Sequence, residues 1–280
     1  MQLLMPTLLA VALVAIALQL FVSGQFQDKI EAWRKTLAAG QISGPPDQAT
    51  IPPIMQAFAL RNGATVGGPP LMVSQQTDEM RLGPDQKFFA VAARQLSGTR
   101  DPGFVWEATA TMARVVPIRV VDAHAGGKGW LEVQIAGVVP VATATGPESD
   151  KGEMMRFLSE LAWNPDAILN VAALKWRQID ASTVEVCIET SGGTATVRQL
   201  FDADGDIVGI EADDRPYLVD GKTLPTRWVG RFSDYAQFGT YRLPRHGEVA
   251  WILPQGEFVY FRGTITRFDT AAQETGTSLR

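Results

Sequence analysis

Charged side chains in one stretch of the sequence, residues 150–169, could take part in chemistry. Arg156 and Glu160 are four residues apart, the spacing at which side chains on one face of a helix form an ion pair. Arg215 provides a second guanidinium later in the chain. Such groups could orient the polar end of a ligand at the edge of an apolar pocket. They could also form a structural salt-bridge network that ties the helix edge to a loop.

Aromatic residues are the strongest unusual feature of the sequence. Six of the seven tryptophans lie between Phe104 and Tyr260. The favoured interpretation is that they pack the sheet against the helix, where each indole N–H finds a partner. A curved sheet lined with Trp and Tyr would also make a concave apolar pocket for a lipid-like ligand. The side chains predicted to contact this ligand are Arg156, Glu160, Trp163, Trp176, Arg215, Tyr241, His246, Trp251 and Tyr260.

Other motifs give little support to catalysis or metal binding. His124 and His246 lack the spacing of a zinc site and are interpreted as loop residues, with His246 the better site candidate between two aromatic-rich strands. Residues 202–206 superficially resemble a calcium loop. Ile207 and Asp213 stand where such a loop needs Gly and Glu, so a hairpin turn is predicted. Signatures of hydrolases, nucleotide sites and dinucleotide sites are missing. We therefore expect no cofactor and no metal.

Composition narrows the class of protein further. The 280 residues are 46% hydrophobic and 20% charged, which is typical of a folded globular chain. A net charge of −5, with no basic face carrying interleaved aromatics, argues against nucleic acid as a partner. The single cysteine, Cys187, excludes an intrachain disulfide and is interpreted as inert.

One strong helix is predicted within residues 150–169. Asp150 and Glu153 have the spacing of a capping box at its start. Asn164 and Pro165 then fit the N-cap and first position of a second short helical turn, with Trp163 at the corner. An apolar face at helical spacing is made by Met154, Phe157, Leu158 and Leu161.

The rest of the chain from residue 51 is typical of short strands joined by Gly and Asp turns. Residues 54–60 are predicted to be a short helix, and residues 84–96 an irregular or helical connection. Strands at roughly ten-residue spacing predict an antiparallel meander that curls or closes. The predicted fold is mostly β within the α+β class: a curved antiparallel sheet, open or half-barrel, packed on one central helix. The predicted strands are 71–82, 104–112, 115–121, 130–136, 174–179, 183–189, 194–201, 207–212, 227–235, 248–252 and 258–268.

The N-terminal segment is predicted to be a transmembrane helix. Residues 3–22 carry no charge and are long enough to cross a bilayer. No Lys or Arg precedes the span, so an uncut membrane anchor is favoured over a cleaved signal peptide. The cleaved signal peptide stays open as an alternative, because residues 22–24 include small residues at which a signal peptidase could cut. Lys29, Arg34 and Lys35 follow the span, so the positive-inside rule would keep the domain cytoplasmic.

Four regions are predicted along the chain. They are an anchor or signal segment at 1–24, a juxtamembrane helix and linker at 25–50, a single β-rich domain at 51–268 and a disordered tail at 269–280. Within the second region an amphipathic helix is predicted to lie on lipid or on the domain, with an apolar face made by Phe26, Ile30, Trp33 and Leu37.

Spaced Trp, Arg and Pro residues between 51 and 268 resemble those of an uncharacterised bacterial family of unknown function, which often carries an N-terminal membrane segment. The segments that carry the resemblance are 156–165, 174–176, 201–205, 214–215, 239–244, 248–251 and 258–260. The predicted strand–helix–strand layout is also similar to the half-barrel of lipoprotein-localisation factors, which holds acyl chains. The two resemblances imply a membrane-anchored, periplasmic domain. The family resemblance implies no activity, and lipid binding is implied by the second resemblance alone.

Three functions remain open from the sequence. The favoured one is a membrane-anchored binding or carrier protein for an apolar or lipid-like ligand, without defined catalysis. A second is a hydrolase-like enzyme that uses Glu160 or Glu248 with His246. The third is a structural or assembly factor that meets an unknown protein partner through a sheet edge or an aromatic patch.

Overall fold

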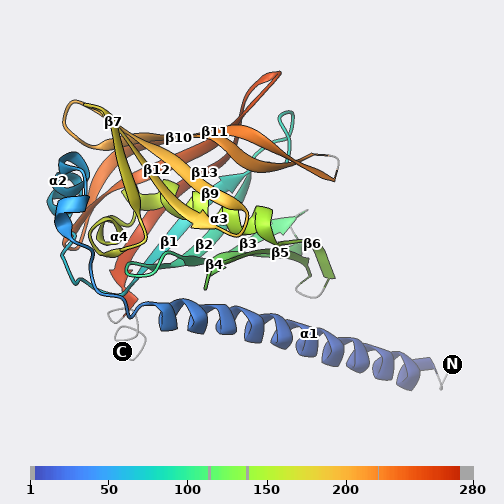
Figure 1. Ribbon diagram of the computed structural model, residues 1–280. Helices are drawn as coiled ribbons and strands as arrows, with labels where there is room; N and C mark the ends of the chain where they lie inside the picture. The colour runs from blue at the N-terminus through green and yellow to red at the C-terminus, as the bar shows by residue number, and fades with distance from the viewer. Residues whose placement is uncertain (1–3, 113–114, 137–138, 220, 272–280) are drawn as a thin grey trace.

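A single antiparallel sheet dominates the computed structural model (Figure 1). The structure describes residues 4–112, 115–136, 139–219 and 221–271, and the side chains of these residues apart from 4–18 and 112. The strands are β1 (Leu71–Met80), β2 (Phe89–Gly98), β3 (Phe104–Met112), β4 (Val116–Ala125), β5 (Lys128–Ile135), β6 (Val139–Thr145), β7 (Lys175–Asp180), β8 (Thr183–Thr190), β9 (Gly193–Phe201), β10 (Ile207–Val219), β11 (Lys222–Phe238), β12 (Tyr241–Leu253) and β13 (Gly256–Thr270).

The strand order is β6-β5-β4-β3-β2-β1-β13-β12-β11-β10-β9-β8-β7. The chain therefore meanders from β1 outward to β6, crosses to the opposite edge at β7, and meanders back until β13 pairs with β1. In that closing pair Ser74 lies opposite Phe268 and Met80 opposite Phe261. The predicted fold class is confirmed as mostly β, with an open antiparallel sheet of 13 strands and associated helices.

The crossing segment lies between the two halves of the sheet (Figure 1). Helix α3 packs against β4 and β5 on one side and against β8, β9 and β10 on the other. Its side chains Met155 and Leu158 are fully buried in the largest hydrophobic core. The helical segments of the chain are α1 (Leu4–Gly40), η1 (Gln48–Thr50), α2 (Pro53–Arg61), α3 (Pro147–Ser159), η2 (Glu160–Ala162) and α4 (Pro165–Asn170).

Helix α1 covers the opposite face of the sheet, where it contacts β2, β3 and β4. Its predicted apolar face is the one that packs: Phe26, Ile30 and Leu37 are buried. Trp33 stacks on Trp130 of β5 with ring centroids 5.4 Å apart. The amphipathic segment thus lies on the domain, and Figure 1 shows the N-terminal half of α1 running on past the sheet.

The predicted membrane segment, residues 3–22, lies largely outside the residues whose side chains the structure describes. Among the described residues, no helix is both long enough and apolar enough to span a membrane. The predicted boundary after residue 24 falls within α1, which is continuous from Leu4 to Gly40. Most of the predicted tail lies outside the described residues, and β13 continues to Thr270.

Several local predictions are wrong. Helix α3 begins at Pro147, after Gly146 as N-cap, so Asp150 and Glu153 form no capping box. Asp150 instead accepts hydrogen bonds from the backbone N–H of Gly129, 2.8 Å away, and from Lys128. Tertiary partners across the chain have replaced the local cap.

Two strands and two histidines also differ from expectation. Strand β2 occupies much of the region predicted to be irregular or helical, and β6 was not predicted. His124 and His246 lie in β4 and β12 rather than in loops. The turn predicted at residues 202–206 is confirmed, because the backbone N–H of Gly205 donates to the carbonyl of Asp202 there.

The packing of α1 predicts that Leu37→Ala destabilises the protein by about 2–5 kcal/mol, because a fully buried side chain leaves a cavity against the sheet. Leu20→Ala is the matched control in the same helix, since Leu20 is 69% exposed. Urea unfolding followed by circular dichroism measures both. Equal stability of the two variants would show that α1 is not packed on the sheet in solution.

Candidate functional site

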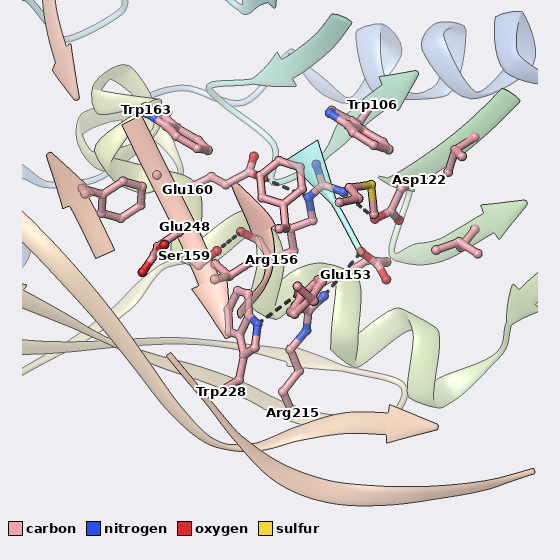
Figure 2. A pocket seen from close by; sticks show the side chains of 18 residues that line it. Trp106, Asp122, Glu153, Arg156, Ser159, Glu160, Trp163, Arg215, Trp228 and Glu248 are labelled. Carbon is pink, nitrogen blue, oxygen red and sulfur yellow. Dashed lines mark hydrogen bonds and ion pairs between the residues drawn. The ribbon is translucent and has the colours of Figure 1, made fainter. Parts of the chain in front are cut away.

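A cavity of about 190 Å³ lies between α3 and the sheet (Figure 2). Its walls come from both halves of the sheet and from the end of the crossing segment. Aliphatic and aromatic side chains make up most of the lining: Met80, Trp106, Val120, Leu131, Trp163, Trp228, Phe232, Val249, Tyr260 and Phe261. Charged and polar side chains in the lining are Asp122, Glu153, Arg156, Ser159, Glu160, Arg215 and Glu248.

Arg156 joins α3 to the sheet at one side of the cavity. Its guanidinium donates from Nε to Glu160 at 2.9 Å, from Nη1 to Asp122 at 2.5 Å and from Nη2 to Gln95 at 3.1 Å. Burial works against the charge on Arg156, but Glu160 and Asp122 outweigh burial and raise its pKa. The guanidinium also lies over the Trp106 ring at 5.0 Å. Each of the three guanidinium nitrogens of Arg156 thus has an acceptor within the protein.

A second charged group combines Glu153, Asp122 and Arg215. Arg215 Nη2 lies 4.0 Å from Oε2 of Glu153, at the limit of an ion pair, and Nη1 donates to the Tyr260 hydroxyl at 3.2 Å. Burial and the neighbouring Asp122 carboxylate raise the pKa of Glu153 well above its usual range. Figure 2 shows Glu153 between Asp122 and Arg215. Of these two carboxyl groups, Glu153 is therefore the one that tends to hold a proton.

Aromatic rings are held in place around these charges. Trp228 donates from Nε1 to the Tyr260 hydroxyl at 3.1 Å and lies under the Arg215 guanidinium, 4.1 Å from the ring centroid. Trp163 donates from Nε1 to the carbonyl of Pro244 at 2.7 Å. A Cβ atom at Gly247 would approach the Trp163 ring to 2.6 Å, so the strand must carry glycine where this indole packs. These contacts keep the walls rigid.

Asp78 is a further buried carboxyl group close to the site. Burial is the main reason that its pKa rises to about 7, and Glu160 adds to the shift. The backbone N–H of Thr264 and the charge on Arg156 oppose the rise. Alternation along β1 puts Gln76 on the same face, where its side chain accepts from Trp106 Nε1 at 3.1 Å. Asp78 therefore adds another acid close to the charged side of the cavity.

The structure brings together five of the residues predicted to contact a ligand. The five that line the cavity are Arg156, Glu160, Trp163, Arg215 and Tyr260. Trp251 lies behind the wall, stacked on Tyr260 with ring centroids 5.9 Å apart. Their role in ligand contact stays a prediction.

The other three predicted residues lie elsewhere. Trp176 is on the edge strand β7, and Tyr241 packs in a separate cluster with Phe268. The His246 ring, half exposed, lies 3.5 Å from Asp234 and 3.0 Å from the Thr264 hydroxyl. His246 is not among the residues that line the cavity with Glu160.

Two carboxylates of the cavity, Asp122 and Glu153, were not among the predicted contacts. A signal for Glu153 exists in the sequence, because helical spacing puts it on the same edge as Arg156 and Glu160. Asp122 falls just beyond the strand predicted at 115–121. Extending the alternation to residue 125 would have placed Asp122 on the same face as Val120.

Comparison with known proteins identifies the family. Residues 41–263 match a family of unknown function, DUF6544, and the chain belongs to it. No curated protein matches the chain in sequence.

Three solved structures are similar to the chain at low sequence identity. A LolA superfamily protein from Nitrosomonas europaea is 12% identical, with a TM-score of 0.44 over 77% of this chain and 91% of that one. An outer membrane lipoprotein-sorting protein domain from Vibrio parahaemolyticus is 12% identical, with a TM-score of 0.45 over 78% and 91%. A DUF1329 family protein from Desulfovibrio piger is 11% identical, with a TM-score of 0.40 over 78% and 92%. The resemblance to a family of unknown function that the sequence predicted is confirmed by the family match, and no activity is inferred from the three structures.

The contacts of Arg156 predict that Arg156→Leu destabilises the protein by about 3–5 kcal/mol, because Asp122 and Glu160 lose their buried counter-ion. Arg177→Leu is the matched control, since this arginine pairs with Glu185 on the surface and its side chain is 68% exposed. Its loss should cost less than about 1 kcal/mol. Urea unfolding compares the two variants, and similar losses would argue against a central role for Arg156.

The raised pKa of Asp78 predicts that stability falls as pH increases. Between pH 3.8 and about 7 the folded state holds a proton on Asp78 that the unfolded state releases, so unfolding becomes easier as pH rises through this window. Asp78→Asn removes this dependence and should stabilise the protein at pH 8 by up to about 4 kcal/mol. Urea unfolding at pH 5 and pH 8 tests this. Identical pH profiles for the variant and the unaltered protein would contradict the assignment.

Proposed function

We propose that this member of the DUF6544 family binds a small amphiphilic molecule in the cavity between α3 and the sheet, and that it acts as a binding or carrier protein. The single observation that carries the proposal is the composition of the cavity. Aromatic and aliphatic walls surround a small number of fixed charged groups, the arrangement found in sites for small molecules.

The size of the cavity supports a short apolar group as the bound part. An engineered apolar cavity of roughly 150 Å³ in another protein accepts benzene. The cavity here, about 190 Å³, would hold a ring or an alkyl segment of similar size, together with a small polar end. A longer acyl chain would have to extend beyond it.

Binding without chemistry is favoured over the hydrolase alternative. That alternative paired Glu160 or Glu248 with His246 as a proton carrier. The His246 ring contacts Asp234 and Thr264 instead. Glu248 pairs with Arg231 and Arg262 at the rim, which leaves it poorly placed as a base inside the cavity. Membrane attachment through residues 3–22, a periplasmic location and an assembly role stay predictions from the sequence.

The proposal predicts that the purified full chain carries a small amphiphile. Mass spectrometry of an organic extract should find one compound at close to one molecule per chain. Val249→Phe narrows the cavity and should reduce the amount of bound amphiphile by at least about tenfold, at a cost of about 1–3 kcal/mol in stability.

Val141→Phe is the control, because Val141 lies on the edge strand β6 and is 51% exposed. This variant should keep its ligand. Equal retention by both variants, or an unaltered protein that extracts empty and takes up no amphiphile when one is added, would contradict the proposal.

A further inference from the structure

We infer that the polar end of the ligand is a protonated amine, held between the carboxyl groups of Asp122 and Glu153. This inference rests on the proposed function and names the chemical class that the same cavity selects. Three features of the cavity support it: the excess of carboxyl groups over guanidinium groups, two carboxyl oxygens that accept no hydrogen bond among the described residues, and the aromatic rings around them.

The arginines do not favour an anionic headgroup. All three donor nitrogens of Arg156 already have acceptors in Gln95, Glu160 and Asp122. Arg215 donates to the Tyr260 hydroxyl and faces Glu153. At Arg156 a bound carboxylate or phosphate would therefore compete with acceptors that the protein supplies itself. The lining contains two guanidinium groups and, besides the rim residue Glu248, three carboxyl groups, so one more cation is needed for neutrality when all are ionised.

Two oxygens in the cavity wall accept no hydrogen bond within the described part of the chain, although Arg215 Nη2 lies 4.0 Å from one of them, Oε2 of Glu153. Oδ1 of Asp122 and Oε2 of Glu153 are buried and have no hydrogen-bond partner among the described residues. Both residues are more than nine-tenths buried, at 7% and 9% exposed, and both line the cavity. Neither oxygen can donate to the other when both groups are ionised. A proton or a cationic N–H donor between them satisfies both.

The walls around this pair favour an organic cation. Trp106 and Trp228 present rings beside the charged groups, and each already lies under a guanidinium, 5.0 and 4.1 Å from the ring centroids. These rings tolerate positive charge nearby. A hydrated metal ion would bring water or oxygen ligands on every side, which the apolar walls do not supply. An ammonium with N–H groups matches two open acceptors better than a quaternary ammonium, which has no donor.

Binding of the amine should release a proton. Glu153 of α3 faces Asp122 of β4 and Arg215 of β10, and Arg156 lies next to them. Glu160 and, from β1, Asp78 interact with Arg156, and His124 of β4 interacts with Asp122. His124 is buried and its pKa falls to about 4, chiefly because of burial, so it stays neutral above that pH. The proton on Glu153 is then the one that an ammonium between the two carboxyl groups displaces. Affinity for an amine should therefore rise with pH, as it does for any ligand that competes with a proton.

The test compares four ligands that share a six-carbon chain: hexylammonium, hexyltrimethylammonium, hexanol and hexanoate. Calorimetry with the full chain at pH 6 and pH 8 gives each Kd, and buffers of different ionisation enthalpy give the number of protons released. Hexylammonium should bind at least about tenfold more tightly than the other three at pH 8, the ratio that one charge-assisted hydrogen bond supplies. Its Kd should rise toward pH 6, by at most about tenfold per pH unit, whereas hexanol should show no pH dependence.

Glu153→Gln removes one of the two carboxyl groups while keeping the shape of the side chain. It should lower the preference for hexylammonium over hexanol by at least about tenfold. Glu185→Gln, on β8 and outside the cavity lining, should leave the preference unchanged. A short-chain phosphatidylethanolamine measured beside hexylammonium identifies the source of the amine. Tighter binding of the phospholipid assigns it to a lipid headgroup and tighter binding of hexylammonium to a free amine, and both outcomes support the inference.

Other outcomes separate this inference from the proposed function. Hexanoate or hexyltrimethylammonium binding as tightly as hexylammonium, or equal Kd values for hexanol and hexylammonium, would overturn the amine while leaving a cavity that binds apolar chains. Failure of all four ligands to bind would overturn the proposed function together with the inference.

Discussion

The buried guanidinium of Arg156 is the contact on which the cavity depends. Removing this charge from water is costly unless its nitrogens find acceptors, and the acceptors come from the helical segment itself, from β2 and from β4. Because those partners are 34 and 61 residues away in the chain, their geometry fixes where α3 crosses the sheet. The space beside Arg156, between α3 and the sheet, is the cavity.

A sheet that is covered on both faces gives the cavity its support. Helix α1 buries Ile30 and Leu37 against the outer face of the half-sheet whose inner face carries Trp106 and Asp122. The two sets of side chains alternate along the same strands, as the pleat requires. The packing of α1 on the outer face and the position of the charged side chains on the inner face are therefore linked, because both depend on the backbone of the same strands. Movement of a strand would disturb both faces together.

The spacing of apolar residues along the sequence predicted those helices and strands that bury one face of their own side chains. Alternation along residues 104–112 and the helical spacing of Met154, Phe157 and Leu158 each match a structural element. The missed elements are those with a weak pattern. β6 is exposed along most of its length, so no apolar face marks it, and β2 mixes alanine with polar residues that are buried only because α3 brings them partners, as Gln95 shows. The capping box was wrong for a different reason: its local pattern is present, but Asp150 accepts its hydrogen bond from Gly129, 21 residues earlier in the chain.

The sequence by itself determined the strand-rich class, the position of the central helix, the apolar face of α1 and five of the side chains that meet in the cavity. Those features depend on side-chain periodicity, which is written along the chain. Only the tertiary structure decided that Asp122 lies against Glu153, that His246 lies away from Glu160, and that Arg156 is engaged by the protein. Contacts between residues far apart in sequence depend on strand order and on the crossing point of α3. The selectivity proposed for the cavity comes from those long-range contacts. Burial and the facing carboxyl group of Asp122 disfavour the ionised form of Glu153, and neither effect exists until the chain has folded.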